Sequence, residues 1–233
     1  MSGGELTGGV DTPKGKKKPK RHPWDWYVEQ PWVTDQLIRT LGSEFFDDAL
    51  IYDPACGRGT ILDVFSDWAF PVMGSDIKRR LPADSFHYFA EYDFLTGRDG
   101  KIDTITTKEP VLSIVSNFPY SLQGGKLVRG LAAEFCLKAL QVATHKVCAL
   151  LPLKWLAGEK KHGLLTRFPA HSYLVLNERP SMPPGNMIEQ LGDKAFKRGK
   201  VDYMWVVWDK QVVTLPGETR TIHITPRPKE ERV

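Results

Sequence analysis

Short apolar runs alternate with helical patterns along most of this chain, and this alternation limits its fold more than any other feature. Seven runs have the length and composition of strands, and they cover residues 49–52, 71–76, 85–95, 111–117, 146–153, 172–179 and 202–210. Most are continuously apolar, which is typical of strands covered on both faces. Between them, Val33, Leu37 and Leu41 share one helical face, and 124–143 has the pattern of a long amphipathic helix. The sequence therefore predicts an α/β fold, a doubly wound, mostly parallel sheet of seven strands with helices on both faces.

The N-terminal segment differs in composition from the rest. Its first 21 residues hold six basic and two acidic side chains, which accounts for the whole net charge of +4. A Gly/Pro/Lys-rich segment of this kind cannot bury enough apolar surface to fold, so we predict a disordered basic tail over 1–22. It is either a solubilising terminus or an arm that finds phosphates. We expect one domain over 23–211, with a loop or lid at 180–202, and a C-terminal extension over 212–233.

Several classes of protein are disfavoured by composition. No apolar stretch reaches the roughly 18 residues of a membrane helix, and the N-terminus lacks the apolar core of a signal peptide. Cys56, Cys136 and Cys148 are too few and too scattered for a disulfide framework or a zinc site. We therefore expect a cytoplasmic protein with reduced thiols, without membrane or metal, that is a monomer or a homodimer.

The first predicted strand runs into the glycine turn DPACGRG. Gly57 and Gly59 would let the backbone approach a ligand closely. Leu62 replaces the third glycine of the dinucleotide fingerprint, and Asp53 would repel a pyrophosphate. An acid at this place suits a ligand with a positively charged amino-acid end. Asp76 ends the next strand, where it could accept hydrogen bonds from a ribose diol. A cationic amino acid joined to a nucleoside is S-adenosylmethionine, which we predict as the cofactor.

A third acid, Asp93, follows the third predicted strand. Single acids at strand ends are often helix caps. Three of them at one rim of a parallel sheet, beyond the carboxyl ends of its strands, favour a ligand site instead.

The fourth predicted strand ends in SNFPYS, residues 116–121. An exocyclic amine on a base is a poor nucleophile, and two hydrogen-bond acceptors aimed at its N–H groups would activate it without a strong base. Asn117 could supply one acceptor through its side-chain oxygen. A main-chain carbonyl nearby could supply the other, because Pro119 keeps Phe118 extended. Tyr120 could stack on a base that has left its duplex.

Together, the glycine turn and NFPY make the chain resemble a class I S-adenosylmethionine-dependent methyltransferase of the Rossmann-like fold. The resemblance covers roughly residues 24–208. NFPY is similar to the [N/D/S]-P-P-[Y/F] signature of DNA adenine-N6 methyltransferases, and SMPPGN and WVVW resemble small phage and prophage enzymes. WYVEQPWVTDQL is similar to the family segment that closes over the cofactor. The resemblance implies catalytic residues Asn117, Phe118, Pro119 and Tyr120. It implies a cofactor site made of Glu29, Pro31, Asp53, Ala55, Gly57, Gly59, Asp76, Ile77, Asp93, Phe94 and Asn117.

Phe118 departs from that signature, since the DNA enzymes have proline at this position. An Asn-hydrophobic-Pro-aromatic variant is found in ribosomal RNA adenine dimethyltransferases, so RNA is an alternative substrate to DNA. Glutamine-amide methyltransferases share the motif, which leaves a protein substrate open. A further alternative is a binding protein without catalysis.

After Asn117 the sequence must still build three strands, so we expect no separate target-recognition domain within it. Contacts with nucleic acid would then fall on two loop regions, through Lys154, Lys160, Lys161, Arg167, Lys194, Lys197 and Arg198. The aromatic cluster Trp24, Trp26, Tyr27 and Trp32 either stacks on bases or, as we favour, packs as a lid on the core.

Overall fold

A computed structural model of the chain describes residues 22–97, 108 and 110–232. The predicted basic tail lies outside these residues except for His22. Within the described part, no helix is long and apolar enough to cross a bilayer.

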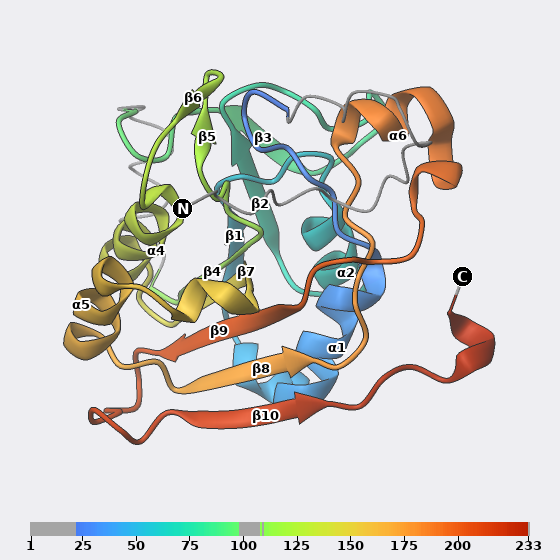
Figure 1. The fold of residues 1–233 in the computed structure, drawn as a ribbon. Coiled ribbons are helices and arrows are strands. Elements are labelled where there is room, and N and C mark those ends of the chain that lie inside the picture. The colour runs from blue at the N-terminus through green and yellow to red at the C-terminus, as the bar shows by residue number, and fades with distance from the viewer. Residues whose placement is uncertain (1–21, 98–107, 109, 233) are drawn as a thin grey trace.

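An eight-stranded sheet forms the centre of the molecule (Figure 1). Its strands are β1 (Leu50–Asp53), β2 (Val72–Asp76), β3 (Tyr88–Glu91), β4 (Leu112–Ser116), β7 (Lys146–Pro152), β8 (Ser172–Leu176), β9 (Tyr203–Asp209) and β10 (Arg220–Ile224). Their order across the sheet is β10-β8-β9-β7-β4-β1-β2-β3. Only β9 runs against its neighbours β7 and β8, while every other pairing is parallel.

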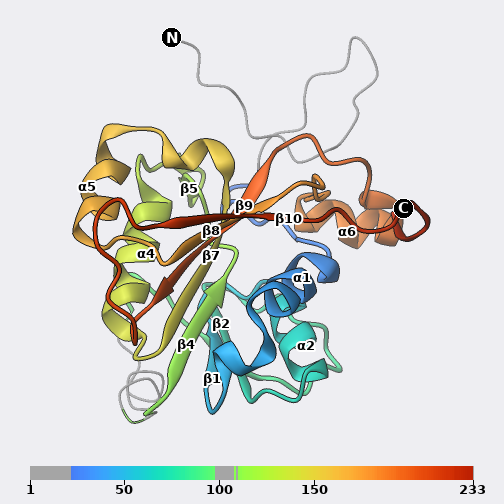
Figure 2. The same ribbon diagram turned by 90° about the horizontal axis from the view of Figure 1, so that it is seen from below.

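Helices cover both faces of this sheet (Figure 2), which confirms the predicted fold class. On one side lie α1 (Pro31–Leu41) and α2 (Thr60–Asp67), and on the other α4 (Leu131–Val142) and α5 (Glu159–Arg167). Between sheet and helices the core is fully buried. Trp205 of β9, for example, has no exposed surface and donates from its indole nitrogen to the carbonyl of Val33 at 3.1 Å. The short elements are α6 (Gly185–Leu191), η1 (Ser43–Phe46), η2 (Leu153–Leu156), η3 (Gly192–Ala195) and η4 (Lys229–Glu231).

The strand count was wrong by one, because β10 lies in the segment predicted as a C-terminal extension. It pairs in parallel with β8 at the edge of the sheet. Only Ile222 and Ile224 alternate there with polar residues, and of the two only Ile224 is buried. Such a weak pattern is enough for an edge strand. It has a neighbouring strand on one side only and is less covered by other elements, so fewer of its residues need to be apolar.

The long helix predicted over 124–143 is also shorter, since α4 begins at Leu131. The residues before it form a hairpin of β5 (Leu122–Gln123) and β6 (Lys126–Leu127). Gly124 and Gly125 make its two-residue turn with φ of 58° and 78°. Two consecutive positive φ values suit glycine and define a tight hairpin turn. The segment 180–202, predicted as a loop or lid, contains α6 and η3.

Candidate functional site

A cavity of about 70 Å³ opens at the carboxyl ends of β1, β2 and β4. The turns that follow these strands form its base, and the segment 24–29 and the start of α4 form its sides. Most of the predicted site residues meet here, although they come from distant parts of the sequence: Glu29, Asp53, Ala55, Gly57, Asp76, Ile77, Asp93, Phe94, Asn117 and Pro119. A shared position beyond the strand ends is where open α/β sheets bind ligands.

Four predicted residues do not line this cavity. Pro31 is exposed at the first position of α1, where its missing N–H costs nothing. Gly59 caps α2 with φ of 89°, and a Cβ there would lie 2.6 Å from the Leu81 side chain, so its role is local. Phe118 is 1% exposed and packs on Phe135, with ring centroids 5.3 Å apart. Tyr120 is described below.

Two buried carboxyls, Asp53 and Glu29, lie at the cavity without a cationic partner among the described residues. Asp53 accepts hydrogen bonds from the Ser116 hydroxyl at 2.7 Å and from the Ala55 amide at 3.0 Å. Burial raises the pKa of Asp53 well above its ordinary value, and the same cause raises the pKa of Glu29. Two acids buried in this way form an environment that a positively charged ligand would stabilise.

Asp76 is bound within the protein by Arg80. The guanidinium of Arg80 forms an ion pair with one oxygen of Asp76, and the other oxygen accepts from the Gly57 amide at 3.0 Å. Arg80 also stacks on the Trp26 ring, 4.9 Å from its centroid. Arginine and indole therefore occupy the space beside the carboxylate that we predicted for the ribose diol. Neither was predicted as a site residue, because their pairing depends on the folded turn.

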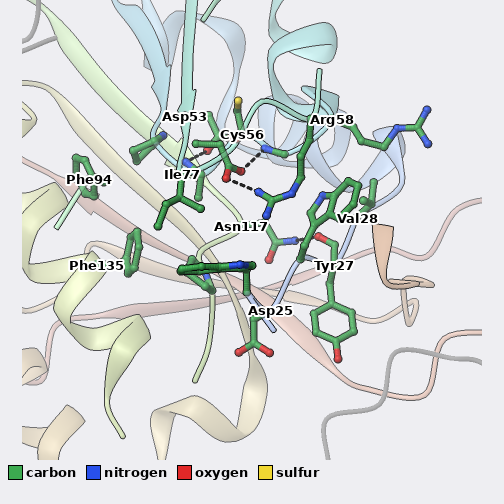
Figure 3. A pocket seen from close by; sticks show the side chains of 18 of the residues that line it. Asp25, Tyr27, Val28, Asp53, Cys56, Arg58, Ile77, Phe94, Asn117 and Phe135 are labelled. Carbon is green, nitrogen blue, oxygen red and sulfur yellow. Dashed lines mark hydrogen bonds and ion pairs between the residues drawn. The ribbon is translucent and has the colours of Figure 1, made fainter. Parts of the chain in front are cut away.

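The side chain of Asn117 is held in a defined orientation (Figure 3). Its amide nitrogen donates to a carboxylate oxygen of Glu29 at 2.8 Å and to the Tyr27 carbonyl at 3.2 Å. A carbonyl can only accept, so the amide nitrogen must face Tyr27 and the amide oxygen must face the other way. That oxygen accepts from the Tyr120 hydroxyl at 2.6 Å.

The position of Tyr120 differs from the prediction that it stacks on a base. Its ring is buried, 6.3 Å from the ring of Tyr203, and only its hydroxyl reaches Asn117. Burial raises the pKa of Tyr120 well above its ordinary value, which keeps the hydroxyl protonated as a donor. Tyr120 is thus a positioning residue for the Asn117 amide. The sequence could not show this, because Tyr203 lies far along the chain.

Apolar side chains form one wall of the cavity, where Figure 3 shows Ile77, Phe94 and Phe135 on the same side. Phe94 and Phe135 stack with centroids 5.9 Å apart. Asp93 also lines the cavity, but its carboxylate accepts from the Leu95 amide at 3.0 Å and the Thr96 hydroxyl at 2.7 Å. Asp93 therefore stabilises its own turn, which is the capping role common for strand-end acids.

The segment 22–29, which we call the cover, crosses the cavity between the β5–β6 hairpin and the start of α6. The Asp25 carboxylate accepts from the Ser121 and Leu122 amides, both at 2.7 Å. On the other side the Gly185 amide donates to the Trp26 carbonyl at 3.0 Å. Trp24, Trp26 and Tyr27 line the cavity, whereas Trp32 packs on the main core and under Arg227, so three of the four aromatic residues form the expected lid.

Replacing Gly185 by alanine is expected to loosen the cover. A Cβ at this position would lie 2.2 Å from the Trp26 ring, and the ring is already enclosed by Arg80 and the glycine turn. Overpacking of this kind costs about 1–3 kcal/mol, which thermal unfolding would detect. Gly163→Ala is the matched control, since a Cβ there meets nothing within 4 Å. Equal melting temperatures for the two variants would contradict the tight fit of Trp26.

The predicted nucleic-acid contacts fall on opposite sides of the molecule. Arg167 is exposed at the end of α5, and Lys194, Lys197 and Arg198 are exposed after α6. Figures 1 and 2 both place α5 and α6 on opposite sides. Lys154 is exposed in η2, while Lys160 and Lys161 belong to α5.

No family model and no curated protein sequence matches this chain. Solved structures match it in fold. One from Pyrococcus horikoshii, called a "putative RNA methyltransferase", is 13% identical, with a TM-score of 0.55 over 84% of this chain and 92% of that one. A SAM-dependent methyltransferase from Archaeoglobus fulgidus is 13% identical, with a TM-score of 0.46 over 78% and 95%. A Lactococcus lactis protein called a "putative hemolysin" has a TM-score of 0.48 at 13% identity over 80% and 91%. The chain therefore shares its fold with the Pyrococcus horikoshii protein.

Proposed function

We propose that this protein transfers a methyl group from S-adenosylmethionine to the exocyclic amino group of adenine in nucleic acid, with DNA as the favoured substrate. The observation that carries the proposal is the meeting of Asn117 with the buried acids Glu29 and Asp53 in one cavity at the carboxyl edge of the sheet. The fold shared with structures named as methyltransferases supports it.

The residues present fit this cofactor. Asp53 and Glu29 offer two buried carboxyls without a cationic partner among the described residues, and a cationic amino-acid end would favour their ionised forms. Asp76 would accept from the ribose hydroxyls once Arg80 has moved, and Ile77 with Phe94 would enclose the adenine. When bound, the cofactor would supply an activated methyl group on its sulfonium.

The target amine would be oriented by Asn117. A carbonyl-type oxygen has two lone pairs, and Tyr120 uses one of them, so the second can accept from an N–H of the substrate. Glu29 and Tyr27 prevent rotation of the amide. A fixed acceptor would stabilise the positive charge that develops on the nitrogen as the N–C bond forms and the carbon–sulfur bond breaks, leaving a neutral thioether. The proton would then leave the nitrogen to solvent.

Transfer of labelled methyl groups tests this function directly. Purified protein would be incubated with labelled S-adenosylmethionine and duplex DNA, single-stranded DNA or ribosomal RNA in parallel, and nuclease digestion would identify the base. Methyladenine in DNA is the expected product. Cofactor binding without any labelled nucleic acid would overturn the proposal in favour of a protein substrate or a silent binder.

RNA is the second candidate substrate, and two observations favour it. Phe118 matches the ribosomal RNA variant of the motif, and the Pyrococcus horikoshii structure carries the name of an RNA methyltransferase. Label confined to RNA in the same assay would select this candidate.

The stability of the ligand-free protein is expected to fall as pH rises. Burial raises the pKa of Glu29 and Asp53 above their ordinary values of 4.5 and 3.8, so folding favours their protonated forms. The contribution of these protonated acids to the free energy of unfolding is complete below the ordinary pKa values and is lost as pH rises through the raised pKa values.

A cationic cofactor favours the ionised acids, so the affinity for the cofactor should rise over the same pH range. Thermal unfolding from about pH 4 to 8, with and without cofactor, would measure both trends. In Asp53→Asn the rise in affinity should be smaller, and an unchanged rise would contradict the assignment.

A further inference from the structure

A second, larger cleft lies beside the cover and has not been assigned a role. Its volume is about 790 Å³, and its lining residues come from the end of β8, the segment after η3 and the C-terminal residues. Gln30, which directly follows the cavity residue Glu29, forms part of its wall. The side-chain oxygen of Gln30 accepts from the Ser181 amide at 3.1 Å. Two adjacent residues, Glu29 and Gln30, therefore line the candidate active site and this cleft, respectively.

Positive charge predominates in the cleft. Two acids, Glu178 and Asp202, face five cationic side chains: Arg179, Lys197, Arg198, Arg227 and Arg232. The described part of the α4–α5 groove on the opposite side of the molecule has only Arg129 and Arg167 against Glu134.

The five cations are not equally available. Arg227 makes two bonds to Glu178, at 2.6 and 3.2 Å, and lies 4.3 Å from the Trp32 ring centroid, so it anchors the C-terminal segment. Arg179 pairs with Asp202 at 2.6 Å, but both side chains are more than half exposed, and such pairs exchange readily. Lys197 and Arg198 are exposed, and no side-chain hydrogen bond or ion pair within the described residues occupies them.

The backbone holds these two side chains at the rim. The Lys197 amide donates to the Ser181 hydroxyl at 2.9 Å. A Cβ at Gly199 would lie 2.3 Å from the Arg179 carbonyl oxygen, so the two segments approach closely only because this residue is glycine. Lys197 and Arg198 are thus presented by a fixed turn.

We propose that this cleft binds the phosphate backbone of the nucleic acid whose base enters the candidate active site, and that the C-terminal segment completes it through Arg232. The proposal rests on the proposed function, because it names where that substrate is held. Exposed lysine and arginine bind phosphates through charge and hydrogen bonds, and such contacts position a nucleic acid without reading its sequence. Arg232 lines the cleft, where its Nε donates to the Arg227 carbonyl at 2.6 Å and pairs with Glu178 at 3.7 Å, with 37% of its side chain exposed.

Charge reversal at the two available cations tests the proposal. The double variant Lys197→Glu/Arg198→Glu would be compared with Arg129→Glu/Arg167→Glu, which makes the same change on the opposite side. Because the sequence alone predicts Arg167 as a nucleic-acid contact too, this comparison decides between the two sides. Binding of a fluorescent DNA duplex and of a labelled RNA hairpin would be measured over a series of salt concentrations. We expect the cleft variant to lose at least about tenfold in affinity and its salt slope to fall by about 1.8, the value for two lost phosphate contacts on a duplex. The groove variant should change less than about threefold.

Cofactor affinity, measured in the same variants, separates this proposal from the proposed function. An unchanged value shows that the cleft variant is folded. Wild-type protein that binds nucleic acid through the cleft but transfers no methyl group would overturn the function and leave the cleft supported. A cleft variant that binds like wild type, or a groove variant that loses as much affinity, would overturn the cleft. Lys197→Gln/Arg198→Gln should lose less affinity than the charge reversal, as an electrostatic contact requires.

Discussion

Replacing Asn117 by alanine should reduce the rate of methyl transfer by about 100- to 1,000-fold, the usual cost of removing one fixed polar group at a reacting centre. The amide oxygen is the only side-chain acceptor that Glu29, Tyr27 and Tyr120 together hold in one orientation within the described cavity. Cofactor affinity should change much less, since Asp53 and Asp76 remain. Single-turnover transfer and cofactor titration on the same preparation would measure both quantities.

Two further variants show whether a lower transfer rate in Asn117→Ala is specific to this residue and depends on its orientation. Asn186→Ala removes an exposed asparagine from α6 and should leave transfer unchanged. Tyr120→Phe removes only the hydroxyl bound to the Asn117 oxygen, so it should lower the maximal rate with little effect on the Michaelis constant. Full activity in Asn117→Ala would show that the amine is held elsewhere. Full activity in Tyr120→Phe would show that Asn117 needs no orientation by this phenol.

Much of the fold was predictable because its signals are local. Continuous apolar runs such as 112–116 and 146–152 identify strands buried on both faces, and each was found. The hairpin before α4 was predictable in principle, because Gly124 and Gly125 are a two-residue turn signal between short apolar runs. It was missed because the helical pattern of α4 was extended across it. β10 was missed because an edge strand needs only two apolar residues.

The candidate site was predictable where a residue follows a strand directly, since parallel strands bring their carboxyl ends together. Asp53, Asp76 and Asn117 met in the cavity for this reason. Side-chain direction was not predictable. Whether Tyr120 faces a base or Tyr203, and whether Asp76 is open or paired with Arg80, depends on packing between segments far apart in sequence.

Replacing Asp76 or Arg80, the two members of one ion pair, is expected to change the affinity for the cofactor in opposite directions. In this structure Arg80 pairs with the carboxylate oxygen that a ribose hydroxyl would need. Asp76→Ala removes that acceptor and should weaken cofactor binding about 10- to 100-fold, the range for hydrogen bonds to a charged group. Arg80→Ala should strengthen binding about tenfold. No ion pair then has to be broken, and one oxygen of the buried Asp76 lacks the Arg80 donor until a ligand replaces it.

Calorimetric titration of both variants with S-adenosylmethionine would test this pair of effects, together with melting temperatures. Both variants should unfold at lower temperature than wild type, since each breaks a largely buried ion pair whose side chains are 9% exposed. Loss of stability alone therefore does not explain opposite changes in affinity. Arg79→Ala is the matched control, because Arg79 is exposed and stacks on Phe89 at 5.1 Å instead. If Arg80→Ala weakened binding as much as Asp76→Ala, Arg80 would itself hold the cofactor, and the closed ion pair would be part of the bound site.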